Sequence, residues 1–258
     1  MTTLVDCPQS RGGEWTFSLF GVPVRVKFWF WIAVLLLGGE QEPVSMVTWI
    51  AVCFGSILLH EFGHVYAFRL FGEDAEVVLY GWGGMAIPRR GCQSHLARFV
   101  VALAGPAAGF CLAGLTMIAA VLSGARIHFG FHLFLPTLAA WPAMVHESSS
   151  LPPSFHWYTL LNDLLFVNFY WGIVNLLPVF PLDGGHASRA LFEQHDPYSG
   201  RRKSLILSAV VAALMALLGI PEGSLYMIVL FGVLAVSSLQ SLESERHRPY
   251  PTRRMNES

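Results

Sequence analysis

The chain has 258 residues, of which 54% are hydrophobic and 13% are charged, and its formal net charge is −1. Soluble domains usually carry about 25% charged residues, so this composition excludes an ordinary soluble enzyme and predicts a chain that lies largely in lipid. A protein that binds nucleic acid usually has a basic face, so a nearly neutral chain argues against a nucleic-acid partner.

Long apolar segments follow one another along the chain, and about 20 mostly apolar residues suffice for a helix to cross a bilayer. We predict an α-helical integral membrane protein with about six transmembrane helices. The expected spans are Phe28–Gly39 (extended backwards by Val22–Val26), Val44–Leu70, Leu96–Leu122, Tyr158–Phe180, Ser204–Gly219 and Ser224–Leu239. Residues 1–240 are interpreted as a single membrane-embedded domain, and residues 241–258 as a flexible, charged cytoplasmic tail.

Three connecting segments have patterns of their own. Phe17–Lys27 and Glu76–Pro88 are rich in β-forming residues and are broken by Gly and Pro, which indicates short strands. Backbone that is not helical needs cover from protein or a water-filled cavity near membrane depth, so we expect these two segments to pair with each other near the cytoplasmic side. Ala125–His156 mixes Phe, Trp, Pro and His and is expected to lie along the outer membrane interface.

Positive charge is unevenly distributed between the loops. With six spans, fifteen of the sixteen Lys and Arg residues fall on one side of the membrane, and only Arg126 falls on the other. Cytoplasmic loops are enriched in Lys and Arg. We therefore predict a multi-pass protein of a bacterial-type cell membrane, with both termini in the cytoplasm.

The second apolar segment contains His60, Glu61 and His64 in the pattern H-E-x-x-H. Residues four apart lie on one face of a helix, so both imidazoles can bind one metal ion while Glu61 reaches a water molecule beside it. This is the zincin arrangement, with two His ligands, a Glu general base and an open coordination position. Charged groups at membrane depth are costly without a partner, which favours one bound Zn²⁺ over three side chains bonded only to one another.

A zinc site needs a third protein ligand, and two aspartates border the fourth apolar segment. Asp183 lies at its cytoplasmic end, at a depth similar to that of His60 and His64, whereas Asp163 lies at the opposite end and is interpreted as a cap or interface carboxylate. Depth alone leaves two interpretations of Asp183 open, because a Pro-Leu-Asp-Gly-Gly sequence is also typical of an ordinary turn.

The sequence HEFGH, followed on a later segment by Asn175, Pro178 and Leu182-Asp183-Gly184, resembles the paired signature of the site-2 protease family of intramembrane zinc metalloproteases. That signature is H-E-x-x-H with N-x-x-P-x-x-x-L-D-G, and the resemblance extends from about Phe17 to Leu239, in a compact form without PDZ or CBS domains. It implies that His60, His64 and Asp183 bind zinc and that Glu61 activates water. It also implies that Asn175 holds the substrate or the transition-state oxygen, and Pro178 is assigned to the same substrate site.

Two glycine-containing stretches bear on this resemblance. Gly83 and Gly84 are candidates for substrate binding, because a substrate strand can approach a glycine backbone closely and pair with it; a plain tight loop is the alternative. In the third segment, Gly109 stands where many relatives in that family have Asn. We interpret Ala104–Gly109 as small-residue helix packing with a proline kink.

We therefore expect an intramembrane zinc metalloendopeptidase that cuts within or near the transmembrane segment of a membrane-anchored protein and releases a cytoplasmic fragment, as in regulated intramembrane proteolysis. Its expected partners are the bilayer, that protein substrate and an unidentified regulatory membrane partner, with no nucleic acid. The alternatives are a membrane zinc hydrolase with a non-protein or small-peptide substrate, and a non-catalytic metal-binding or transport protein. Polar groups concentrated in the cytoplasmic half argue against a transporter, and the intact Glu61 argues against a non-catalytic protein.

Overall fold

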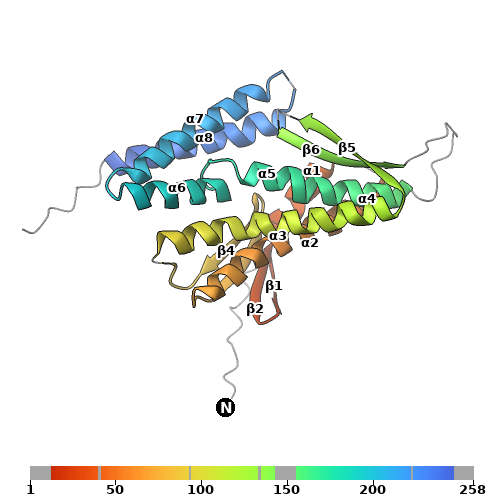
Figure 1. Ribbon diagram of the computed structural model, residues 1–258, viewed down its shortest axis with the longest axis horizontal. Helices are drawn as coiled ribbons and strands as arrows, with labels where there is room; N and C mark the ends of the chain where they lie inside the picture. Colours follow the sequence, from red (N-terminus) through yellow and green to blue (C-terminus); the bar gives the residue numbers. More distant parts are fainter. Residues whose placement is uncertain are drawn as a thin grey trace, which may run out of the picture. The chain divides into compact units, whose positions relative to one another are not determined.

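The structure is a computed structural model that describes residues 13–39, 42–92, 94–132, 135–142, 155–221 and 223–246. The chain divides into two compact units, residues 1–176 and 177–258, and each is described by itself. The first unit contains two sheets and most of the helices (Figure 1). Its elements are β1 (Glu14–Leu19), β2 (Val22–Lys27), α1 (Phe28–Gly38), α2 (Pro43–Leu70), β3 (Ala75–Tyr80), β4 (Gly83–Pro88), α3 (His95–Leu122), β5 (Ala125–His132), β6 (Leu135–Pro142), α4 (Phe155–Leu165), the π-helical turn η1 (Phe166–Tyr170) and α5 (Trp171–Asn175).

The larger sheet has four strands in the order β1-β2-β3-β4. β1 and β2 form a hairpin whose two turn residues, Phe20 and Gly21, both have positive φ, the backbone twist that two-residue hairpin turns require. The valines of β2 alternate with more exposed residues, so that Val22, Val24 and Val26 are buried on one face. Their burial stabilises the sheet by roughly 1.5–3 kcal/mol for each side chain.

Strands β2 and β3 lie side by side and parallel, with Val24 opposite Val77, and Arg25 of β2 forms an ion pair with Glu76 of β3. This pairing confirms the prediction that the segments Phe17–Lys27 and Glu76–Pro88 form strands and pair with each other. β4 is antiparallel to β3 and forms the opposite edge of the sheet from β1.

Three helices of the described residues are long and apolar enough to cross a membrane: α2, α3 and α8 (Leu225–Arg246). α1 is apolar but has only 11 residues. The fourth expected span corresponds to the helical run α4–η1–α5, which ends at Asn175 rather than Phe180, and the fifth corresponds to α7 (Gly200–Leu218). The count of six spans therefore stays a prediction.

One expectation about the connecting segments was wrong. Val22–Val26 does not extend the first span, because its alternating valines place it in the sheet as β2. Ala125–Pro142 forms the antiparallel hairpin β5–β6, in which Asn162 of α4 bonds both the backbone N–H and the carbonyl of Ala140. Its expected location along the outer membrane interface stays a prediction. Residues 143–154 of that segment lie outside the described residues.

The second unit contains α6 (Asp183–His195), α7 and α8, with α7 packed against both of the others (Figure 1). Ala212 of α7 and Phe231 of α8 are fully buried in it. α8 continues to Arg246, so the tail expected from residue 241 begins inside a helix, and the remaining residues lie outside the described part of the chain. The expectation of a single domain over residues 1–240 stays a prediction.

Candidate metal centre

The two histidines of the H-E-x-x-H pattern face each other on α2. The Nε2 atoms of His60 and His64 are 3.2 Å apart, and the ring centroids are 4.9 Å apart. Helical spacing of four residues therefore brings the two imidazoles to one point, as the sequence predicts.

The orientation of His64 is set by helix α3. Its Nδ1 is 2.7 Å from the carbonyl oxygen of Val101. A carbonyl oxygen only accepts hydrogen bonds, so Nδ1 must carry the proton and donate it. The Nε2 of His64 is then the unprotonated nitrogen that a metal ion can bind, and the bond to Val101 fixes the ring plane as outer-shell partners of metal ligands usually do.

Glu61 is buried beside the edge strand β4. A Cβ atom built on Gly84 would lie 2.5 Å from both Cγ and Oε1 of Glu61, so the carboxylate occupies the space that a side chain at position 84 would fill. Tyr80 of β3 also lies within reach of this charge: burial raises the pKa of its phenol, and the negative charge of Glu61 raises it further. The carboxylate of Glu61 is thus enclosed by the end of the β3–β4 hairpin.

Glycines of α2 and α3 allow a close crossing of these helices. A Cβ atom on Gly105 would collide with the Nε2 of His64 and lie 2.7 Å from the Nε2 of His60, and one on Gly63 would lie 2.5 Å from the carbonyl oxygen of Ala104. This observation supports the interpretation of Ala104–Gly109 as small-residue packing. It also gives Gly105 a role that the sequence alone did not suggest, because only glycine leaves room for the two ring nitrogens.

The residues present fit a zinc ion. His60, Glu61 and His64 each offer a ligand atom, and these atoms all lie within 4.8 Å of one another. Two imidazole nitrogens with a nearby carboxylate form a donor set that zinc prefers, and the tautomer of His64 is already the ligating one.

The remaining predicted site residues lie on other elements and connecting segments. Asp183 is the first residue of α6 in the second unit, and Pro178 is half-buried in the segment before it. Asn175 is the last residue of α5, and Gly83 and Gly84 begin β4. Zinc ligation by Asp183 and substrate binding by Asn175, Pro178, Gly83 and Gly84 stay predictions.

Asp163 is not a helix cap, contrary to one of its two interpretations. It lies inside α4, half-buried, and its Oδ2 atom has no hydrogen-bond partner among the described residues.

A buried polar contact on α2, one helical turn before His60, was not predicted from the sequence. The Nδ2 atom of Asn168, in η1, donates to Ser56 Oγ at 2.8 Å, and Ser56 lies one helical turn before His60 on α2. A Cβ atom on Gly109 would lie 3.7 Å from Asn168 Oδ1, so the side-chain amide of Asn168 in η1 lies beside Gly109 of α3. The only signal in the sequence was the presence of an Asn within an apolar span.

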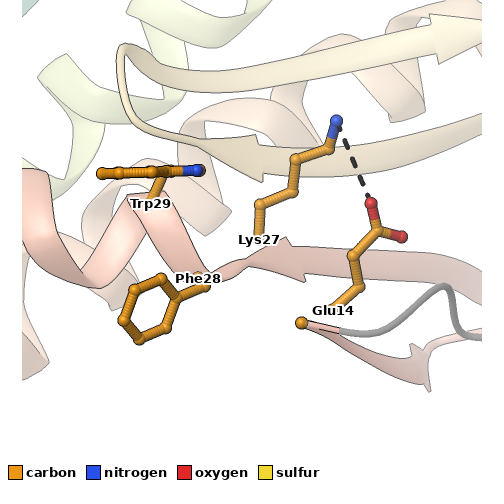
Figure 2. Close-up of a pocket in the computed structure, with 5 residues that line it drawn as sticks. Glu14, Lys27, Phe28 and Trp29 are labelled. Carbon is orange, nitrogen blue, oxygen red and sulfur yellow. Dashed lines mark ion pairs between the residues drawn. The ribbon is translucent and has the colours of Figure 1, made fainter.

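A shallow cavity of about 310 Å³ lies elsewhere in the first unit, where β2 leads into α1 (Figure 2). Gly13, Glu14, Lys27, Phe28 and Trp29 line it, and Figure 2 shows the ammonium group of Lys27 directed at Glu14, 3.9 Å away. None of the candidate metal-site residues lines this cavity. Exposed Phe and Trp rings beside a lysine are typical of a membrane–water interface.

Comparisons with known proteins give matches in both sequence and structure. The model of peptidase family M50 matches residues 48–217. A zinc metalloprotease of Methanocaldococcus jannaschii is 24% identical over 236 residues, which cover 88% of this chain and 56% of that protein. The chain spans about half the length of the curated relatives it matches. The solved structure of a site-2 protease from the same organism has a similar fold, with a TM-score of 0.57 and 20% identity over 89% of this chain and 95% of that one.

Proposed function

Because this chain belongs to peptidase family M50, the site-2 protease family of zinc metalloproteases, we propose that it hydrolyses a peptide bond within or near the transmembrane segment of a membrane-anchored protein. The observation that carries this proposal is the position of His60, Glu61 and His64. Their ligand atoms lie close together on a helix that is apolar enough to cross a bilayer. A hydrolytic site at that place is accessible to a substrate that is itself held in the membrane. The product on the cytoplasmic side would be released as a soluble fragment.

In this proposal His60 and His64 bind zinc through their Nε2 atoms, and Asp183 is the third ligand. Bound zinc supplies Lewis acidity, which polarises a carbonyl group and lowers the pKa of water to about 7. Glu61 accepts a proton from the attacking water, whose oxygen bonds to the carbonyl carbon of the substrate. Glu61 then donates that proton to the amide nitrogen as the C–N bond breaks, so that the products are a carboxylic acid, which keeps the second proton of the water, and an amine.

The free edge of β4 is the proposed site for the substrate backbone. Among the residues that the structure describes, β4 pairs with β3 on one side only, and Gly84 lies directly against Glu61. A substrate segment that adds to this edge as an extended strand would have its peptide bonds held next to the general base. Gly83 and Gly84 present no side chain to obstruct it, and Asn175 supplies an amide donor for the substrate or the transition-state oxygen.

Replacing Asp183 with alanine is expected to lower zinc affinity by more than the roughly 10- to 100-fold loss that follows removal of an outer-shell partner. Asp163→Ala is the matched control, because it removes the other aspartate bordering the fourth segment and should leave zinc binding unchanged. The measurement is zinc content after dialysis against a graded series of chelator concentrations. Equal zinc retention in the two variants would remove Asp183 from the ligand set.

The substrate helix must unwind locally before cleavage, because each peptide carbonyl of a helix is bonded to an N–H four residues along. Gly and Pro disfavour helix by about 1 and 3 kcal/mol relative to Ala. Replacing such residues with leucine in the cytoplasmic half of a tagged single-span substrate is therefore expected to slow cleavage, and the same change in the outer half should matter less. Cleavage rates are compared by immunoblot in cells that co-express protease and substrate. Equal rates for the parent and the inner-half leucine substrate would show that unwinding is not limiting.

The distribution of Lys and Arg gives an expected topology. Reporter domains fused after Arg90 or Arg201 should read as cytoplasmic, and a reporter fused after Leu151 should read as extracytoplasmic. Alkaline phosphatase and a fluorescent protein, which are active on opposite sides of the membrane, provide the two readouts. A cytoplasmic reading after Leu151 would contradict the model of six spans.

A further inference from the structure

The backbone just before Asp183 forms a hydrogen bond with a serine of α7. The N–H group of Phe180 donates to Ser208 Oγ at 2.8 Å. Ser208 is buried, at 1% exposure, and lies 28 residues further along the chain. Within the segment, the N–H of Val179 bonds the carbonyl of Leu177 and the N–H of Leu182 bonds the carbonyl of Val179, which are short turns.

The hydroxyl groups of Ser208 and Ser238 extend the hydrogen bond of Phe180 into a chain, in which each bond runs from donor to acceptor in the same direction. Ser208 Oγ lies 2.7 Å from Ser238 Oγ of α8, and Ser238 Oγ donates to the carbonyl oxygen of Leu234 at 2.9 Å. A serine hydroxyl has a single proton. Because Ser238 gives its proton to Leu234, Ser208 must be the donor to Ser238, which leaves the Ser208 oxygen to accept from Phe180. Each donor in this buried chain has one acceptor, the condition under which such networks add rigidity.

The first turn of α6 packs closely against the same peptide group. A Cβ atom on Gly185 would lie 2.6 Å from Phe180 N and 2.6 Å from the carbonyl carbon of Val179. The Val179–Phe180 peptide is therefore fixed between Gly185 and Ser208. Asp183 lies between those two fixed points in sequence, three residues after Phe180 and two before Gly185.

We infer that Ser208 is a positioning residue for Asp183: the chain Phe180–Ser208–Ser238 fixes the conformation of the segment that carries the proposed third zinc ligand. This inference rests on the proposed role of Asp183 as a ligand. Without the Ser208 hydroxyl, the Phe180 N–H loses its acceptor and the segment can shift. Zinc affinity is then lower because part of the binding free energy is used to order the segment again.

The test uses the full chain in lipid nanodiscs and compares Ser208→Ala with Ser204→Ala. Ser204 is a matched control, because it is also buried on α7 but its Oγ donates to Arg201 within its own helix. Zinc affinity is measured by chelator competition, and hydrogen–deuterium exchange of residues 177–183 is measured in the metal-free protein. Ser208→Ala is expected to lower zinc affinity by about 10- to 100-fold, as loss of an outer-shell partner does, and to speed exchange in that segment. Ser204→Ala should change neither, and Ser208→Thr, which keeps the hydroxyl, should retain most of the affinity.

The outcomes of this test distinguish a failure of the inference from a failure of the proposed function. If Ser208→Ala exchanges faster but binds zinc as tightly as the parent, the positioning role is wrong while Asp183 can still be a ligand. If Asp183→Ala also binds zinc as the parent does, the ligand assignment itself fails. Should Ser208→Ala not fold, Ser238→Ala decides, because it removes only the acceptor of the Ser208 proton. Unchanged affinity and exchange in Ser238→Ala would then overturn the inference.

Discussion

Glu61→Gln is expected to lower the rate of peptide-bond hydrolysis by about 10²- to 10⁴-fold, the usual contribution of a general base, while zinc stays bound. Glutamine has the same shape as glutamate and therefore fills the same buried space against Gly84. It cannot accept the proton of the attacking water, so only the chemical step is affected. The measurements are zinc content of the purified variant and cleavage of a tagged single-span substrate.

The same experiment distinguishes two roles that the geometry allows. The carboxylate of Glu61 is close enough to His60 and His64 to contribute a ligand atom. If the variant loses zinc together with activity, Glu61 is a ligand and another residue must serve as the base. If it keeps both zinc and activity, neither role is correct.

Gly105→Ala is expected to lower zinc affinity by more than about 100-fold, which exceeds the usual effect of an outer-shell change. The added methyl group would collide with His64 Nε2 and lie 2.7 Å from His60 Nε2, the two nitrogens proposed to bind the metal. His64 cannot easily turn away, because its Nδ1 is bonded to Val101 at 2.7 Å. Alanine favours helix over glycine by about 1 kcal/mol, so the loss of zinc is not expected to come from a weaker α3. Chelator competition and the melting temperature of the metal-free protein measure the two effects separately.

Gly114→Ala is the matched control for that prediction. Gly114 lies on the same helix, and nothing lies within 4 Å of the position of its added methyl group. This variant should gain the same helix propensity and keep full zinc affinity. Parent-like zinc binding in Gly105→Ala would show that the crossing of α2 and α3 adjusts freely around the histidines.

The local part of the site could be predicted from the sequence, because helix periodicity is a local property. The spacing of His60 and His64 was enough to place both rings on one face of a helix, and the structure confirms this with their Nε2 atoms 3.2 Å apart. The β-rich pattern of the two connecting segments was likewise enough to predict that they pair, as β2 and β3 do.

Contacts between distant segments could not be predicted in this way. Nothing near Gly84 or Gly105 in the sequence shows that one lies against Glu61 and the other against both histidines. The same holds for Asn168, whose bond to Ser56 joins residues 112 positions apart. The hairpin β5–β6 was missed for a different reason: its mixture of Phe, Pro and His has no clear period of two, and the pairing of β5 with β6 determines its structure instead.

The parallel pairing of β2 with β3 sets an order for the biogenesis of the protein. Each of the hairpins β1–β2 and β3–β4 can form locally, but the sheet closes only when Val24 meets Val77, and all of α1 and α2 lies between these residues. Pairings of such long sequence separation form late. Because β4 follows α2 in the chain, Glu61 is synthesised before the strand whose Gly84 packs against it. A nascent chain that ends between α2 and β4 therefore already contains His60, Glu61 and His64, but it still lacks the strand that lies against Glu61.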